Sequence, residues 1–195
     1  MTQAHPRKAV QADPFVTIEI MDRLPPADLN DLCDATDAAI EGGGGFGWVS
    51  LPAREVLERY WKGVLVVPER HLLLARMDGV VCGAAQLVEP SRHNEAQSFS
   101  AQVLASFVAP WARNRGAGRK LVETAEKLAL EMGYKVLHLD VRETQEAAIR
   151  LYESMGYRRW GVNPAYAFVN NRAIAGYYYT KVISPLFTLK DAVSG

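Results

Sequence analysis

Arg113, Gly116 and Gly118 form an R-x-x-G-x-G run that stands between an apolar extended stretch and an amphipathic helix. The start of a helix presents unpaired N–H groups and a partial positive charge, and glycine lets the backbone approach an anion without a Cβ in the way. Neighbouring arginines and a lysine add cationic charge. The run therefore predicts a phosphate cradle made by Arg113, Asn114, Arg115, Gly116, Ala117, Gly118 and Arg119.

Two other phosphate motifs do not describe this run. Lys120 is followed by Leu121, which excludes the pattern G-x-x-x-x-G-K-[ST]. Leu121 also occupies the third glycine position of G-x-G-x-x-G. A glycine pair between a strand and a helix is often only a turn, so a plain turn is the alternative interpretation of the run.

The residues on either side of the run indicate the elements that position it. The segment 103–108 has the β-branched, aromatic and aliphatic composition of a strand, and Pro110 cannot continue a strand ladder. A strand at 136–141, a helix at 145–154 and a strand starting at 157 follow. The helix between the run and Gly133 is indicated by apolar residues at helical spacing: Leu121, Val122, Ala125, Leu128, Ala129 and Met132.

The order of these motifs resembles the GNAT superfamily of acyl-CoA N-acyltransferases. A strand, R-x-x-G-x-G, a helix and L-x-L-x-V are followed by A-x-x-L-Y-x-x-x-G-Y, which is carried here by Ala148, Leu151, Tyr152, Gly156 and Tyr157. The clear match covers residues 104–160, and a looser one covers 15–183. Within the superfamily, the segments L-H-L-D at 137–140 and N-P-A-Y at 163–166 are similar to the tabtoxin-resistance type of acetyltransferase.

The resemblance implies the GNAT fold, an α/β (α+β) architecture. We expect a mixed, mostly antiparallel twisted sheet of about six or seven strands, about four flanking helices, and central parallel strands that are splayed at the CoA site. Residues 14–184 would form a single domain, with a flexible arm at 1–13 and a tail at 185–195. Before the cradle we expect a strand at 15–20, helices at 26–40 and 52–62, a hairpin joining 72–76 to 80–88, and a long strand at 97–108.

The resemblance also implies that acetyl-CoA is the co-substrate. Its pyrophosphate would lie against the N–H groups of residues 113–119. A backbone N–H near Phe107 or Val108 would stabilise the negative charge that develops on the thioester carbonyl. Gln145 stands before the second helix, where the family commonly has Asn, so any contact to the pantetheine arm depends on the longer amide.

An amine must lose its proton before it can attack a thioester. For an amine of pKa about 10.4, deprotonation at pH 7 costs roughly 4.6 kcal/mol. Asp140 is the leading candidate for the base, because it lies with His138 on one face of a central strand, where apolar residues are expected. The alternative roles of Asp140 are a solvated carboxylate at the strand end or a structural partner of Arg142. His138 is a candidate residue for binding the acceptor, and its alternative role is that of a core histidine hydrogen-bonded to the backbone.

Tyr152 is the candidate donor of a hydrogen bond to the leaving thiolate. A thiol of pKa about 8.5 is a stronger acid than a phenol of about 10, so full transfer from an untuned tyrosine runs uphill by roughly 2 kcal/mol. We therefore expect Tyr152 to assist catalysis without being indispensable. The alternative is an aromatic on the core-facing stripe of its helix, together with Ala148, Leu151 and Met155.

The glycine cluster at 41–48 also has two interpretations. It is a flexible connection whose aromatic residues Phe46 and Trp48 anchor it to the core, or it is a mobile lid beside the acceptor. The resemblance places the loop between the first two helices beside the acceptor cleft. Trp48 is accordingly a candidate substrate-binding residue.

Length and composition fit one soluble enzyme domain. The chain has 195 residues, of which 49% are hydrophobic, which suffices for one substantial core. Its 22 basic and 22 acidic residues cancel, so no general attraction to nucleic acid or an anionic membrane is expected. Cys33 and Cys82 lack metal-ligand spacing, so we expect no metal. No apolar run approaches the roughly 20 residues of a membrane span, so we expect a cytoplasmic protein.

These residues predict an acetyl-CoA-dependent N-acetyltransferase that acts on a primary amine of a small molecule or peptide by direct attack in a ternary complex. The alternative is a non-catalytic module of the same fold that senses acyl-CoA and releases no thiol. A nucleic-acid-binding domain built on the basic turn is disfavoured by the net charge. The resemblance further implies a homodimer.

Overall fold

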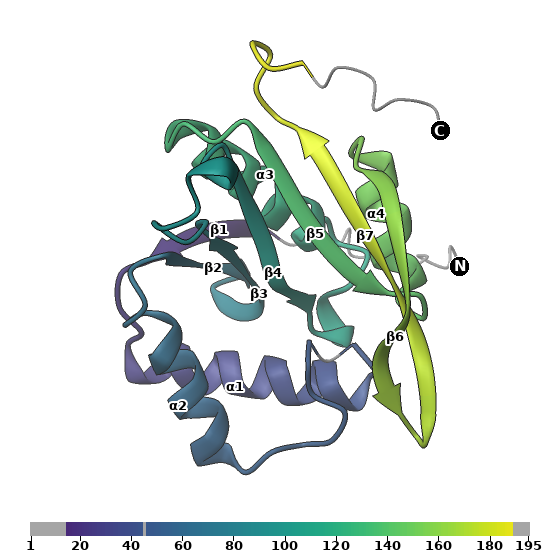
Figure 1. Cartoon of the computed structure of the whole chain (residues 1–195). Coiled ribbons are helices and arrows are strands. Elements are labelled where there is room, and N and C mark those ends of the chain that lie inside the picture. Colours follow the sequence, from purple (N-terminus) through teal and green to yellow (C-terminus); the bar gives the residue numbers. More distant parts are fainter. Residues whose placement is uncertain (1–14, 45, 189–195) are drawn as a thin grey trace, which may run out of the picture.

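The structure is a computed structural model that describes residues 15–44 and 46–188. In this part of the chain, seven strands form one sheet in the order β1-β2-β3-β4-β5-β7-β6, and four α-helices flank it (Figure 1). The strands are β1 (Val16–Met21), β2 (Arg70–Met77), β3 (Val80–Val88), β4 (Ser100–Val108), β5 (Val136–Arg142), β6 (Arg158–Val169) and β7 (Arg172–Val182). The helices are α1 (Pro26–Glu41), α2 (Arg54–Val64), α3 (Ala117–Glu131) and α4 (Glu146–Ser154).

The predicted GNAT-type sheet, mixed and mostly antiparallel, is confirmed. β4 and β5 pair in parallel and are connected through α3, while the other neighbouring pairs of described strands are antiparallel. The long strand expected from Gln97 begins at Ser100 instead, because Glu95–Gln97 forms a 3₁₀ turn. The expected arm at 1–13 and residues 189–195 of the expected tail lie outside the described residues.

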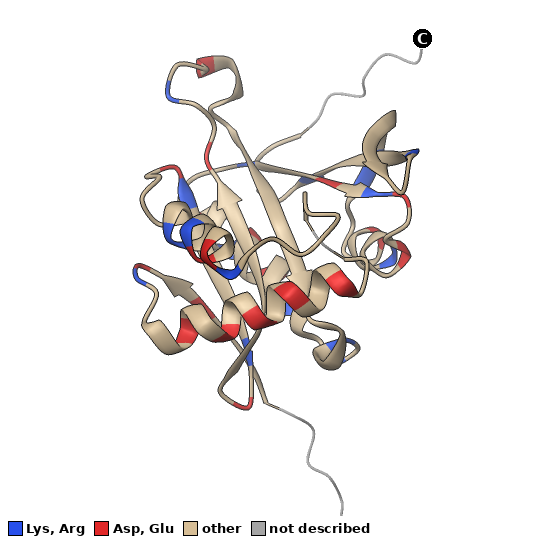
Figure 2. Ribbon diagram, turned by 90° about the horizontal axis from the view of Figure 1, so that it is seen from below, with Lys and Arg blue, Asp and Glu red and all other residues tan. Residues whose placement is uncertain are grey.

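The two faces of the sheet pack against different helices. Successive side chains of a strand point to opposite faces, so Leu72 and Leu74 of β2 pack with α1 and α2, while Leu73 and Ala75 pack with α3. Figure 2 shows acidic residues spaced along α1, and none of them is among the buried residues of this helix. Helices thus occupy both faces of the sheet, and a cleft forms where the strands separate.

β4 and β5 separate partway along their length. Their parallel pairing ends at Val103 opposite Leu139, whereas β4 continues along β3 to Val108. Next to this point Ala105 has a φ of 48°, and the register between β3 and β4 shifts, which marks a bulge. Bulges bend a strand and increase its twist. The predicted splay of the central parallel strands is therefore present.

Gly83 lets β3 stay close to the separated half of β4. A Cβ built on Gly83 would lie 2.5 Å from the carbonyl oxygen of Phe107, and real Cβ atoms essentially never approach backbone so closely. Any side chain at this position would push β4 away from β3. The position of residues 107–108 at the splay thus depends on a glycine in the neighbouring strand.

A second bulge interrupts β6. Asn163 pairs with Gly176 of β7 and Ala167 pairs with Ile174, so residues 164–166 face one residue of β7. The Asn163 side-chain oxygen accepts a hydrogen bond from the N–H of Ala165 over 3.0 Å, which closes a local turn. Because Pro164 cannot donate to a ladder, the bulge is where β6 can accommodate it.

Candidate active site

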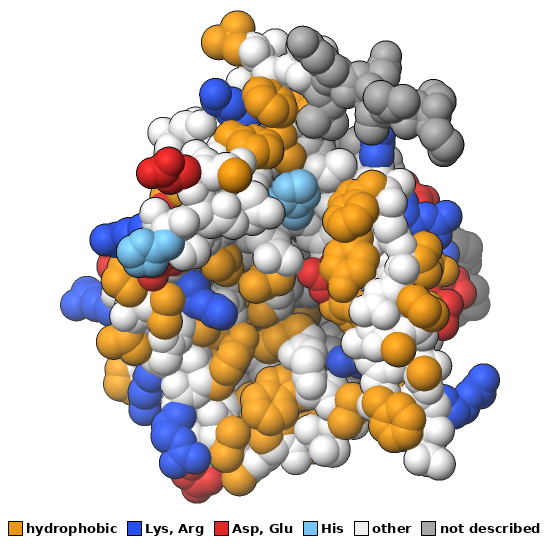
Figure 3. Space-filling view, viewed as in Figure 1, with side chains coloured by type: hydrophobic (Ala, Val, Ile, Leu, Met, Phe, Trp, Pro, Cys, Tyr) orange, Lys and Arg blue, Asp and Glu red, His pale blue; other side chains and the backbone are white. Residues whose placement is uncertain are grey.

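A cleft of about 570 Å³ opens where β4 and β5 separate. The loop after α1, the strands β3, β4 and β5, helix α4 and the bulged part of β6 contribute to its lining. Figure 3 shows that this face of the molecule is hollowed, with hydrophobic side chains gathered around the hollow. The charged and polar lining side chains are Arg70, Asp140, Arg142, Tyr60, Gln86, Ser106, Gln145, Tyr152 and Tyr166.

Asp140 lies in this cleft, on β5. Its carboxylate accepts hydrogen bonds from two neutral groups: Gln102 Nε2 donates to Oδ1 over 3.1 Å, and the Tyr166 hydroxyl donates to Oδ2. The guanidinium of Arg142, which the sequence left open as a partner, donates instead to the Trp48 carbonyl oxygen over 3.5 Å. Asp140 therefore forms no ion pair with the described residues, and its negative charge can act on an amine.

Tyr166 reaches Asp140 because of the β6 bulge and a glycine opposite it. A Cβ on Gly176 would lie 2.1 Å from Cγ of the Tyr166 ring, so the ring occupies space that only glycine leaves free. Burial raises the pKa of Tyr166, and its hydrogen bond to Asp140 raises it further, so the phenol keeps its proton. The sequence identified Tyr166 only as part of a subgroup resemblance. The Asn-Pro pair inside a strand was the local signal for the bulge.

Tyr152 lies in α4 and contributes to the same cleft. Its ring packs edge-on against Tyr157, with 6.0 Å between centroids, and tilted against Tyr179 at 6.3 Å. Burial raises the pKa of Tyr152; a hydrogen bond with Ser106 opposes this shift and the charge of Asp140 adds to it. The residue thus combines the core-facing role with access to the cleft, and it presents a protonated phenol.

The predicted cradle has the backbone of an anion-binding nest. Asn114 and Gly116 both have left-handed backbone conformations, with φ of 61° and 84°. Gly116 is the N-cap of α3, and no side chain caps the helix, so its first N–H groups remain available. A glycine is needed at position 116 because the backbone there is left-handed, whereas at position 118 it is needed because a Cβ would lie close to the side chain of Leu151.

The cationic side chains around the cradle differ in how they are held. Lys120 donates to the Val16 carbonyl oxygen over 2.8 Å, and Arg119 donates to the Ser154 hydroxyl over 2.8 Å. Arg113 donates from Nε to the Val108 carbonyl oxygen over 3.2 Å. Arg113 and Arg115 are exposed and have no carboxylate partner in the described part of the chain, so they are the cations best placed to meet a phosphate.

The backbone donor expected near residues 107–108 can be narrowed to one of them. The N–H of Ala109 donates to the Cys82 carbonyl oxygen of β3 over 2.8 Å. Because N–H groups alternate in direction along a strand, the N–H of Phe107 also points to β3 and that of Val108 points toward the separated β5 side. Val108 is therefore the one of the two whose N–H faces the separated side of β4, although neither Phe107 nor Val108 is among the residues that line the cleft.

The glycine-rich loop is tied to both sides of the cleft. Gln145 donates from Nε2 to the Gly43 carbonyl oxygen over 2.6 Å, and the ring of Phe46 stacks on Phe107 with 5.0 Å between centroids. Trp48 packs edge-on against Tyr60 at 6.4 Å and lies outside the lining, to which Phe46 and neighbouring loop residues contribute. Gln145 thus contacts the loop rather than being free.

His138 lies apart from the cleft lining. It is half-buried on β5, and burial lowers its pKa, so the imidazole is neutral near pH 7. No group of three or more His, Cys, Asp or Glu side chains in the described ranges could hold a metal ion. None of the described helices is long and apolar enough to cross a membrane.

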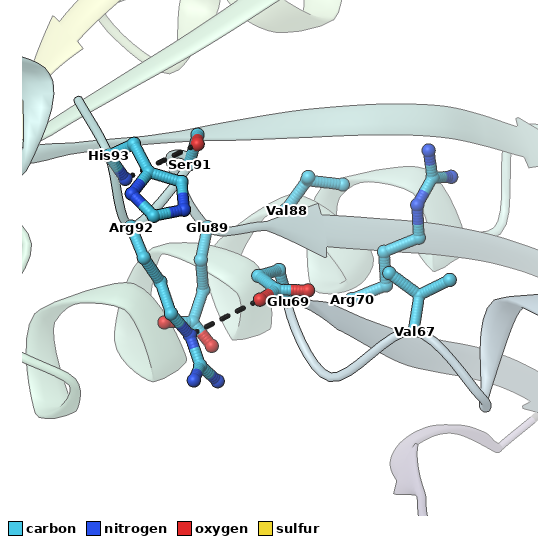
Figure 4. A pocket seen from close by; sticks show the side chains of 8 residues that line it. All are labelled: Val67, Glu69, Arg70, Val88, Glu89, Ser91, Arg92 and His93. Atoms are coloured by element: carbon cyan, nitrogen blue, oxygen red, sulfur yellow. Dashed lines mark hydrogen bonds and ion pairs between the residues drawn. The ribbon is translucent and has the colours of Figure 1, made fainter.

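A second hollow of about 420 Å³ lies at the ends of β2 and β3, and Figure 4 shows the side chains that line it. Its carboxylates and Arg92 all have partners, whereas Arg70, which lines both hollows, bonds to Gln86 and to no carboxylate in the described part of the chain. Arg92 pairs with Glu69 at 3.3 Å, and Glu89 is held by His71 at 2.9 Å and by the Tyr134 hydroxyl at 2.7 Å. The splayed cleft is therefore the stronger candidate for chemistry.

Comparisons with known proteins point to one protein family. The model of the acetyltransferase (GNAT) family matches residues 37–157. An uncharacterized N-acetyltransferase of Azospirillum brasilense is 60% identical over 130 residues, which cover 67% of this chain and 77% of that protein. The N-alpha-acetyltransferase RimI of Mycobacterium tuberculosis is 34% identical over 102 residues, covering 52% of this chain and 61% of RimI.

Among solved structures, YncA of Salmonella typhimurium, which is described as an acetyltransferase with its cofactor acetyl-CoA, has a TM-score of 0.71. It is 17% identical, and the similarity covers 91% of this chain and 99% of YncA. The family match at 37–157 includes the cradle, Asp140 and Tyr152, whereas Tyr166 lies after it.

Proposed function

The chain belongs to the GNAT family of acetyltransferases, and we propose that it transfers the acetyl group of acetyl-CoA to a primary amine of a small molecule or peptide. The transfer takes place by direct attack of the amine within a ternary complex. The observation that carries this proposal is the convergence of Asp140, Tyr166 and Tyr152 on one cleft at the splay of β4 and β5.

The residues present fit acetyl-CoA. Asn114 and Gly116 shape a nest at an uncapped helix start, and Arg113 and Arg115 add charge for the pyrophosphate. A Cβ on Gly118 would contact Leu151 at 3.3 Å, so the glycine preserves a narrow space between α3 and α4. Bound acetyl-CoA supplies the electrophilic thioester.

Asp140 receives the proton that the amine must lose. Its position is fixed by Gln102 and Tyr166, which donate to different carboxylate oxygens and leave the group negatively charged. The roughly 4.6 kcal/mol needed to deprotonate a lysine-like amine at pH 7 is the free energy that such a base helps to supply. Tyr166 acts as a positioning residue, because it works through Asp140.

Tyr152 donates a hydrogen bond to the leaving sulfur, and the N–H of Val108 donates to the carbonyl oxygen as charge develops there. The raised pKa of Tyr152 means that the phenol is protonated throughout the neutral range. It also makes complete proton transfer less favourable than for an ordinary tyrosine. Tyr152 therefore stabilises the thiolate chiefly by hydrogen bonding.

The cysteines support direct transfer rather than an acetyl-cysteine intermediate. Cys33 and Cys82 are completely buried, and burial raises the pKa of each thiol to about 11. A buried, protonated thiol is a poor nucleophile. Neither residue contributes to the cleft. The acetyl group therefore has no thiol acceptor in the described part of the chain before the amine.

The relatives support an amine as the acceptor. The family match and the N-acetyltransferases among the relatives support the proposal that acetyl is transferred to nitrogen. The printed name of RimI specifies an N-alpha-amine for that protein, and a peptide amine is one of the acceptors that we propose here. A homodimer, which the resemblance implies, stays a prediction.

Calorimetric titration with acetyl-CoA followed by an assay of free thiol release with a panel of amines tests the proposal. Binding followed by amine-dependent thiol release and acetylated amine is the expected result. Binding without release under any amine would favour the acyl-CoA sensor. Absence of binding would contradict the proposed use of acetyl-CoA.

A further inference from the structure

Arg70 brings a positive charge to the side of the cleft opposite Asp140. It begins β2 and contributes to the cleft lining. Figure 4 shows its guanidinium turned away from Glu69 and Arg92, which pair with each other. In residues 15–44 and 46–188, Arg70 has no carboxylate partner within ion-pair distance. A half-buried arginine without a counterion is suited to bind an anion.

A buried amide fixes this arginine in place. Arg70 donates from Nη1 to Gln86 Oε1 over 2.8 Å, and Gln86 is completely buried. Gln86 in turn donates from Nε2 to the Tyr60 hydroxyl over 2.9 Å. Since an arginine has five N–H donors, one bond to Gln86 leaves most of them for a ligand. These hydrogen bonds orient the guanidinium of Arg70 and leave its positive charge without a counterion.

Tyr60 supplies a second donor beside Arg70. Its oxygen accepts the bond from Gln86, and its own O–H has no acceptor in the described part of the chain. Burial raises the pKa of Tyr60, while the bond from Gln86 and the charge of Arg70 lower it. The hydroxyl therefore stays protonated close to the guanidinium. Together the two groups match an oxyanion, which accepts several hydrogen bonds.

The charges of the cleft lining also favour an acceptor that carries an acid. Arg70 and Arg142 are positive and Asp140 is negative, so the described lining has a net charge of one positive unit. A polyamine would place further positive charges beside two arginines, which costs free energy by like-charge repulsion. An acceptor with an amine at one end and an acid at the other pairs with Asp140 and Arg70.

The sheet register sets the separation of these two groups. Gln86 of β3 pairs with Leu104 of β4, and the adjacent Val103 pairs with Leu139 of β5, the residue before Asp140. Gln86, which holds the Arg70 guanidinium, and Asp140 are thus two strands apart, and because the β4–β5 pairing ends at Leu139 their backbones are separated by at least roughly 10 Å at about 4.8 Å per paired strand. An α-amino acid, whose amine and carboxylate are attached to the same carbon, is too short to span this distance.

We propose that the acceptor is a zwitterion whose primary amine is separated by a chain of several atoms from a carboxylate or a similar oxyacid, which Arg70 and Tyr60 bind. Gln86 is the positioning residue for both. This inference depends on the proposed function, because it specifies the substrate class of the same cleft. The apolar lining between the two ends would contact the intervening chain.

Matched pairs of amines with and without the acid test the proposal. The pairs are γ-aminobutyrate with propylamine, ε-aminocaproate with pentylamine, and diglycine with its C-terminal amide. Thiol release gives kcat/KM for the wild-type enzyme, Arg70→Met, Arg70→Lys and the control Arg92→Met, an exposed arginine outside the cleft. Melting temperature and the Kd of acetyl-CoA establish that each variant is folded.

The expected result is that at least one acid is preferred over its neutral partner by roughly 10- to 100-fold, the range for a charge-assisted hydrogen bond. Arg70→Met removes this preference and Arg70→Lys keeps part of it, while Arg92→Met keeps all of it. Equal kcat/KM for every pair in the wild type, or an unchanged preference in Arg70→Met, would overturn the inference even though amines are acetylated.

A binding measurement separates this inference from the proposed function. N-acetylated products of the same acids are titrated into the enzyme with CoA present. If no amine is acetylated but these acids bind the wild type and not Arg70→Met, the proposed function fails and the anion site stands. If the acids bind both proteins equally, the anion site fails.

Discussion

Gly176→Ala tests whether the position of Tyr166 supports catalysis. The added Cβ would lie 2.1 Å from Cγ, 2.4 Å from Cδ2 and 2.7 Å from Cβ of Tyr166, against an ordinary contact of at least 3.4 Å. The ring must therefore move by about 1.3 Å, which takes its hydroxyl away from Asp140. Misplacement of this size near a reacting group can cost up to about 100-fold in rate.

We expect kcat to fall roughly 10- to 100-fold in Gly176→Ala while the Kd of acetyl-CoA stays the same. Gly161→Ala in β6 is the matched control, because its Cβ would meet Tyr178 only at an ordinary 3.9 Å. The kinetic assay is amine-dependent thiol release.

A double variant shows whether the loss acts through the tyrosine. Tyr166→Gly removes both the ring and the Cβ that collide with the new methyl group, so Gly176→Ala should cost nothing further in that background. Full activity of Gly176→Ala, or additive losses in the double variant, would refute this reasoning.

Three further outcomes follow from other contacts. Tyr152→Phe should lower kcat about tenfold with little change in the Kd of acetyl-CoA, since it removes one hydrogen bond to the leaving group; a larger loss of binding than of turnover would argue for a purely structural tyrosine. Gly118→Val should weaken acetyl-CoA binding at least about tenfold by calorimetry, because its side chain fills the space toward Leu151, and unchanged affinity would remove the cradle from the account. Asp28 accepts two bonds of 2.8 Å from Arg76, which lower its pKa, so this stabilisation is complete above the ordinary carboxyl value and is lost as the pH falls through the folded value. Asp28→Asn should therefore cost about 2 kcal/mol in denaturant unfolding at pH 7 and much less at pH 2, and an equal cost at both would contradict the pairing.

The motifs with strong local causes could be predicted from the sequence. Proline and glycine set the start and end of α1 and the turn at the start of α3, and alternation placed Asp140 on the cleft face of β5. The separation of β4 and β5 was expected from the family resemblance alone, because no local sequence pattern predicts it. These features depend on backbone preference and hydrophobic period, both of which a sequence carries.

The partners of the site residues could not be predicted, because they depend on strand register and loop position. Asp140 is held by Gln102 and Tyr166, which are 38 and 26 positions away in the chain. To predict the contact of Tyr166 with Asp140, the bulge in β6 would have to be known. To predict that Arg70 lies across the cleft from Asp140, the register of strands β2 to β5 would have to be known. Trp48 was selected as the aromatic of the glycine loop, but Phe46 contributes to the cleft instead.

The central claim is direct transfer of acetyl from acetyl-CoA to an amine in this cleft. The most direct measurement mixes enzyme and acetyl-CoA in stoichiometric amounts with and without ε-aminocaproate, and follows protein mass, free thiol and N-acetylated product. The account predicts unchanged protein mass, and thiol and N-acetylated product in equal amounts only when the amine is present. Acetylation of the protein before the amine is added, or thiol release without N-acetylated product, would contradict it.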